Sequence, residues 1–126
     1  EDLGIYNVEN VLVDNCHFEN IQGAVANIYR GGTDESTYGP WVSIRKSRLV
    51  NCGKGSRNKI ASSLAFHGVQ NLRIEDTTLE HSAPIDLHLT NGDPITVVKN
   101  IVLKESGKIN SNSNTYTQEN ITISKN

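Results

Sequence analysis

The stretch NLRIEDTTLEHS at residues 71–82 decides the fold of this 126-residue chain. Its apolar or small residues occupy positions 72, 74, 77, 79 and 82. Alternation with a period of two residues is typical of a β-strand that buries one face. Here the alternation is broken by the polar pair at 75 and 76 and then resumes. The stretch therefore predicts two short strands that meet at a bend.

Two earlier stretches repeat this pattern. NVLVDNCHFENI at 10–21 has apolar or small residues at 11, 13, 16, 18 and 21, and WVSIRKSRLVNC at 41–52 has them at 42, 44, 47, 49 and 52. Two weaker copies follow, NIVLKES at 100–106 and NITISKN at 120–126. Strands are thus expected to start at 11, 42, 72, 101 and 121, with separations of 31, 30, 29 and 20 residues. Such repeats indicate a solenoid, whose units bury their apolar faces by stacking on one another.

A third short strand is expected in each repeat, at residues 24–29, 63–67 and 85–89, with 108–110 as a possible fourth. Three strands per repeat over about five repeats predict an all-β, right-handed parallel β-helix, a single-stranded β-solenoid, with residues 1–126 as one domain. A β-sandwich would need a hairpin turn about every 8–12 residues, and only Asn91-Gly92-Asp93 fits that. Because the chain starts without Met and soon enters a repeat, we expect a fragment or C-terminal domain of a larger protein.

An asparagine precedes the first strand in four of the repeats, at Asn10, Asn71, Asn100 and Asn120, and Trp41 takes that place in the second. Asn tolerates the left-handed backbone conformation, and its amide can bond an equivalent amide one coil away. We therefore expect an asparagine ladder at this corner, interrupted at Trp41.

The composition argues against two classes of function, nucleic-acid binding and membrane association. The chain has 12 basic and 14 acidic residues and a net charge of −2, which argues against nucleic-acid binding. No run approaches the roughly 20 apolar residues of a membrane-spanning helix, so no membrane partner is expected. Cys16 and Cys52 occupy apolar repeat positions, where a thiol acts as a small hydrophobe, and free thiols are favoured over a disulfide.

The third strands place polar residues together. If the apolar residues at 28, 66 and 87 point inward, alternation puts polar side chains of successive coils on the outer face of one sheet: Tyr29, His67, Asp86 and His88. This face is a candidate for contact with a carbohydrate, although an ordinary solvent-exposed surface fits the pattern too. We assign it no catalytic residue, but His with Tyr or Arg could supply the base and the acid that β-elimination needs.

A basic stretch is the second candidate. Arg45, Lys46 and Arg48 are expected on one strand, and the loop that follows carries Lys54, Arg57 and Lys59. Clustered cations can hold uronate carboxylates or sulfates. A solvated edge whose charges keep the coils from associating fits the stretch equally.

The run YRGGTDESTYGP at residues 29–40 is the most distinctive of the chain. Arg30 either fixes this loop by pairing with Asp34 or Glu35 or contacts a substrate, and two adjacent carboxylates alone do not make a metal site. Lying between two coils of the repeat, the run resembles the C-terminal β-helix of chondroitinase B-like polysaccharide lyases, a group that includes many alginate lyases. The resemblance extends over residues 5 to about 105, and only this run is specific.

The resemblance implies a secreted or periplasmic bacterial protein that cleaves acidic polysaccharides by β-elimination. In such enzymes a Lys and Arg pair, commonly with calcium, lies in an N-terminal catalytic β-helix. Neither the pair nor its acidic metal ligands match positions here, so we expect this chain to be an accessory domain without cofactor or metal. Its partners would be an acidic polysaccharide and the catalytic β-helix of the same protein.

Two other functions fit the same residues. A self-sufficient carbohydrate-active enzyme would use the face of Tyr29, His67 and His88, whereas a structural or adhesion solenoid would bind no uronate polymer. The residues expected to contact substrate are Tyr29, Arg30, Lys54, Arg57, Lys59, His67, Asp86 and His88.

Overall fold

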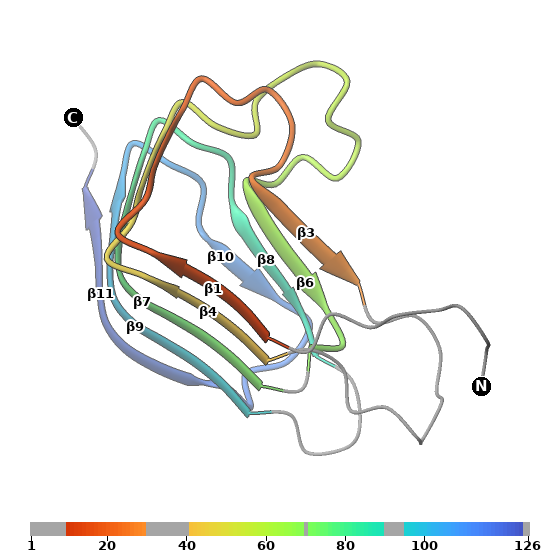
Figure 1. Ribbon diagram of the computed structural model, residues 1–126, viewed down its shortest axis with the longest axis vertical. Helices are drawn as coiled ribbons and strands as arrows, with labels where there is room; N and C mark the ends of the chain where they lie inside the picture. The colour runs from red at the N-terminus through yellow and green to blue at the C-terminus, as the bar shows by residue number, and fades with distance from the viewer. Residues whose placement is uncertain (1–9, 30–40, 70, 90–94, 125–126) are drawn as a thin grey trace.

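A computed structural model of the chain describes residues 10–29, 41–69, 71–89 and 95–124. These residues form strands and no helix (Figure 1). The strands are β1 (Asn10–Asp14), β2 (His17–Glu19), β3 (Ala26–Tyr29), β4 (Trp41–Arg45), β5 (Arg48–Val50), β6 (Leu64–His67), β7 (Asn71–Glu80), β8 (Ile85–His88), β9 (Ile95–Lys104), β10 (Ile109–Ser111) and β11 (Thr117–Ser124).

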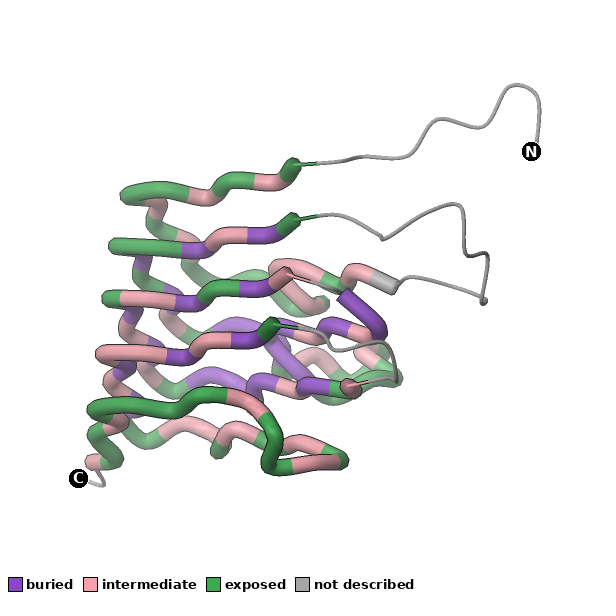
Figure 2. Tube along the Cα trace, turned by 90° about the horizontal axis from the view of Figure 1, so that it is seen from below, coloured by how far each residue is buried: buried purple, intermediate pink, exposed green. Residues whose placement is uncertain are grey.

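Every strand pair of the described residues is parallel. In one sheet β1, β4, β7, β9 and β11 stack in that order, and β2 and β5 extend the same sheet beside β7. A second sheet has the order β10-β8-β6-β3. Each coil therefore bonds to the next through equivalent residues, and Figure 2 shows the coils as successive layers. The parallel β-helix with five stacked coils is confirmed.

The bend between the first and second strands of each coil has a common backbone conformation. The corner residue of this bend has a positive φ of 52–57° in all five coils, at Asn15, Lys46, Asp76, Asn100 and Asn120. The other described non-glycine residues with a positive φ have values of 49–59°. A single left-handed residue turns the strand without breaking the alternation on either side. In β7 and β9 one strand of 10 residues continues through this bend.

The core lies in the middle coils. The inward positions predicted at 42, 44, 47, 49 and 52 and at 72, 74, 77, 79 and 82 are all buried. The corresponding positions of the first coil are only half-buried at Val11, Val13 and Phe18, and Ile21 is exposed. Burial thus follows the number of neighbouring coils, as expected where each unit covers its apolar face by stacking.

The register corrects the two weaker repeats. Leu12, Ser43, Arg73, Val97 and Thr117 are equivalent, so the coils advance by 31, 30, 24 and 20 residues. Residue 101 is therefore equivalent to Thr77 in the second strand and does not start the fourth coil. The true start was hidden because Thr96, a polar residue only 3% exposed, occupies the inward position that Leu72 fills one coil earlier.

The asparagine ladder exists, but at a different corner from the one expected. Asn10, Trp41 and Asn71 form one row that continues to Ile95, whereas Asn100 and Asn120 belong to the bend row. There the Nδ2 of Asn120 donates to Oδ1 of Asn100 at 2.7 Å, and the Nδ2 of Asn100 donates to Oδ1 of Asp76 at 2.9 Å. The ladder lies at the bend because the positive φ that favours Asn occurs there.

Truncation of a core leucine should destabilise the protein more than truncation of a surface leucine. Leu49 is fully buried between Phe18 and Leu79 of the neighbouring coils, whereas Leu12 is 65% exposed. We expect Leu49→Ala to lower the free energy of unfolding by about 2–5 kcal/mol in urea titration, since it leaves a cavity. Leu12→Ala, the matched control, should change it by about 0.5 kcal/mol or less. Equal losses would contradict this assignment of the core.

The asparagine ladder leads to a second prediction about stability, at Asn100. Asn100→Ala removes both side-chain hydrogen bonds and places a residue that tolerates the left-handed conformation less well than Asn at this corner, so we expect a loss of about 1–3 kcal/mol in the free energy of unfolding. Asn100→Gly removes the bonds but adopts the backbone conformation freely, and should cost about 1 kcal/mol less than the alanine variant. A glycine variant no more stable than the alanine variant would show that the backbone conformation is unimportant.

Candidate functional site

The outer face of the β3-β6-β8-β10 sheet carries the predicted polar residues. Phe66 and Leu87 are buried, and alternation directs the neighbouring His67 and His88 outward. In-register pairing of β6 with β8 places His67 directly beside His88, and β3 pairs the backbone of Tyr29 with that of His67. The sequence prediction that 28, 66 and 87 face the core and that the histidines share the outer face is confirmed.

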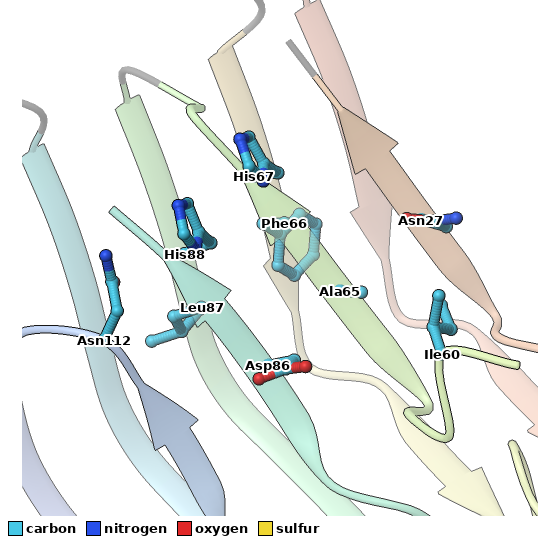
Figure 3. A pocket seen from close by; sticks show the side chains of 9 residues that line it. All are labelled: Asn27, Ile60, Ala65, Phe66, His67, Asp86, Leu87, His88 and Asn112. Atoms are coloured by element: carbon cyan, nitrogen blue, oxygen red, sulfur yellow. The ribbon is translucent and has the colours of Figure 1, made fainter. Parts of the chain in front are cut away.

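A groove of about 440 Å³ runs over this face (Figure 3). Histidines line it at one end and Asp86 with Ala65 at the other, while Ile60 flanks it from the loop before β6. The described residues that line it are Asn27, Ile60, Ala65, Phe66, His67, Asp86, Leu87, His88 and Asn112.

The two imidazole rings of the groove are stacked. The ring centroids of His67 and His88 are 4.1 Å apart, and the ring planes differ by 8°. Desolvation lowers the pKa of His67 below its ordinary value of 6.5, and the neighbouring His88 lowers this pKa further. Both effects favour the neutral form of the His67 imidazole.

Two further groove residues have polar contacts with other coils or loops. The Oδ2 of Asp86 lies 3.4 Å from the hydroxyl of Ser62, which also lies 3.0 Å from the carbonyl of Ile60. Asn112 bonds Leu89 twice, since its Oδ1 accepts from the backbone N at 2.7 Å and its Nδ2 donates to the backbone O at 2.9 Å. The groove thus presents imidazole, amide and carboxylate groups, which suit the hydroxyl groups of a sugar.

Sequence reasoning did not assign Asn27, Ile60, Ala65 or Asn112 to the site. Asn27 could have been found, because it occupies the outward position in register with Ala65, and Ala65 is in register with Asp86. Ile60 and Asn112 lie outside the strands, where alternation gives no signal. Tyr29 has only its strand backbone described, and Arg30 with the rest of the 30–40 run lies outside the described residues.

The basic stretch is divided by the structure. Arg45 ends β4 and Arg48 begins β5, with the bend at Lys46 between them, so these cations do not share one strand. The prediction was wrong because β4 ends at the bend made by the left-handed residue Lys46. Arg45 Nε lies 3.3 Å from Oδ1 of Asp14, and an Arg48 amino group lies 2.6 Å from Oε2 of Glu80.

Lys54, Arg57 and Lys59 lie exposed on the loop between β5 and β6. None of the three lines the groove, although Ile60 of the same loop does. The predicted contact residues thus fall into two groups, the groove residues His67, Asp86 and His88 and the loop cations.

Among the described residues, no three His, Cys, Asp or Glu side chains gather as a metal site would require. Cys16 and Cys52 are free thiols. No helix in the described ranges is long and apolar enough to cross a membrane.

The histidine pair makes a prediction that NMR can check. His67 should titrate below pH 6.5, and His88→Asn should move its pKa back toward that value by removing the neighbouring imidazolium. The unfolded chain binds this proton at higher pH than the folded chain, so stability should fall as the pH drops below 6.5. His67→Asn should reduce that loss in urea titrations. A His67 pKa above 6.5, followed by ring-proton shifts, would contradict the described environment.

Comparison with known proteins relates the chain to a polysaccharide lyase. No protein-family model matches it, and no curated protein does. Two solved structures of the PL6 family alginate lyase AlyGC are similar to it. A mutant of AlyGC matches with a TM-score of 0.86 and 39% identity over 98% of this chain, and a second AlyGC structure with 0.83 and 38% over 100%. In both cases the chain spans only 18% of the length of AlyGC. The chain is thus similar, over its whole length, to a small part of an alginate lyase.

Proposed function

We propose that this chain is an accessory, non-catalytic β-helix domain of a polysaccharide lyase that cleaves uronate polymers such as alginate by β-elimination. The observation that carries the proposal is the match to AlyGC, at 39% identity and a TM-score of 0.86. The match covers 18% of AlyGC, which fits a module that works beside a catalytic β-helix in the same protein. Because a uronate polymer is too large to enter a cell, the protein would work outside the cytoplasm.

The composition of the groove supports a role in contact with the polymer and not in catalysis. β-Elimination at a uronate needs a base for the C5 proton and a positive group that stabilises the enolate formed from the carboxylate. A neutral His67 could accept a proton, but the described lining of the groove contains no Lys or Arg, and Asp86 adds a negative charge. Such a surface holds sugar hydroxyl groups better than it stabilises an enolate.

The loop cations support contact with an acidic polymer. Lys54, Arg57 and Lys59 are exposed, and none of them forms an ion pair with an acidic residue in the described part of the chain. Exposed cations of this kind attract a polyanion in a manner that depends on ionic strength. Hydroxyl contact in the groove and charge contact at the loop are the two components of the proposed binding.

Affinity electrophoresis in gels that contain alginate, chondroitin sulfate or pectate tests this role. The chain should be retarded by a uronate polymer, less so at higher salt, and should release no unsaturated product that absorbs in the ultraviolet. The double variant His67→Ala/His88→Ala should bind about fivefold more weakly, because it loses hydrogen-bonding groups of the groove. His17→Ala, which alters an exposed histidine on β2, is the matched control.

Two results would contradict the proposal. An unsaturated product that disappears in His67→Ala would show that the chain is itself a lyase that uses the groove. The absence of retardation in every gel at every ionic strength would favour a structural or adhesion solenoid.

A further inference from the structure

A second hollow lies at the turns that follow β2 and β5, away from the groove residues. It has a volume of about 380 Å³. The residues that line it are Asn20, Ile21, Gln22, Asn51, Lys54, Gly55 and Ser56. Of the loop cations only Lys54 lines it, and none of its lining residues lines the groove.

The base of the loop is bonded to the preceding coil beside this hollow. The backbone N of Gly53 donates to the carbonyl of Ile21 at 2.8 Å, and that of Gly55 donates to the carbonyl of Gln22 at 2.9 Å. Both positions require glycine. Gly53 has a φ of 80°, and a β-carbon on Gly55 would lie 2.8 Å from the β-carbon of Gln22. Lys54 is therefore held between two fixed points of the backbone.

Asn58 closes the loop. Its Nδ2 donates to the carbonyls of Gly53 at 2.8 Å and of Ser62 at 2.9 Å, which are the two ends of the loop. Its backbone N donates to the carbonyl of Gly55 at 3.0 Å. These bonds give an otherwise irregular segment a defined conformation, so the position of Lys54 does not depend on strand pairing.

The polar groups around the hollow are mainly donors. The Oδ1 of Asn20 accepts from Nδ2 of Asn51 at 2.9 Å, and this bond leaves the amide hydrogens of Asn20 as donors. Gln22, Ser56 and the ammonium group of Lys54 add further donors, and no acidic side chain lines the hollow. Carboxylates accept several such bonds, and bonds to a charged acceptor are stronger than neutral ones.

We propose that this hollow is a carboxylate-binding subsite for a uronate residue, with Lys54, Asn20, Gln22 and Ser56 as its donors and Asn58 as the residue that positions Lys54. This inference rests on the proposed function, because it names the part of the acidic polymer that the loop recognises. The groove would contact the hydroxyl groups of the sugar, and the hollow would bind its carboxylate.

Side-chain amide signals in NMR test the subsite. The ¹⁵N-labelled chain is titrated with a saturated alginate trisaccharide and, separately, with the same trisaccharide after its carboxyl groups have been reduced to alcohols. The acidic sugar should shift the amide signals of Asn20, Gln22 and Asn51, and the reduced sugar should not. Lys54→Gln should weaken the binding by about threefold, the range of an exposed ion pair. Lys108→Gln makes the same change of charge at an exposed site outside the hollow and should leave the binding unchanged.

Asn58→Ala tests the positioning residue. It should weaken binding as Lys54→Gln does, and it should speed cleavage by trypsin after Lys54, Arg57 and Lys59, because the loop loses its closing bonds. The far-ultraviolet circular dichroism of the coils should not change. Rapid cleavage without loss of binding would show that the loop conformation is unimportant for the ligand.

The outcomes separate this inference from the proposed function. Shifts at His67 and His88 without shifts at Asn20 and Gln22 would overturn the subsite and leave the proposed function standing. No shift at either place would overturn both. Equal shifts at the hollow with the acidic and the reduced sugar would show that the hollow does not recognise a carboxylate.

Discussion

In-register hydrogen bonding between parallel coils is the constraint on which the rest of this structure depends. Each strand residue bonds beside its equivalent one coil away, so Leu49 stacks on Leu79 and Leu79 on Leu103. The same register sets His67 beside His88 on the opposite side of the strands. Because successive side chains alternate between two faces, core and groove are the two faces of one repeat. A shift of one residue in any coil would exchange them.

The predictability of the fold followed the clarity of that alternation. Residues 41–52 and 71–82 carry apolar side chains at every inward position, and their strands and burial could be read directly from the sequence. Prediction failed at Thr96, where a buried polar residue concealed the start of a coil. It failed again for the asparagines, since Asn71 and Asn100 look alike in sequence but only Asn100 has a positive φ. For the same reason the groove histidines were predictable, whereas Ile60 and Asn112, which belong to no strand, were not.

Register also organises the charges of the outer faces. One row alternates in sign from coil to coil: Asp14, Arg45, Glu75, Lys99 and Glu119. Opposite charges across neighbouring strands are favourable and like charges are not, so each cation in this row has acidic neighbours on the strands beside it. The loop after β5 is outside this pattern, and there Asn58 and two glycines define the conformation instead. The loop cations proposed to contact a ligand thus lie outside the paired strands.

The unequal advance of the coils, 31, 30, 24 and 20 residues, has an evolutionary consequence. All of the difference in length is accommodated between strands, since equivalent strand residues stay paired whatever the loop contains. The solenoid therefore separates two kinds of change. Substitutions at inward positions are coupled to the coils above and below, whereas the segments between strands can differ in length from coil to coil while the strands stay paired. New surface chemistry can be acquired one corner at a time on an unchanged scaffold.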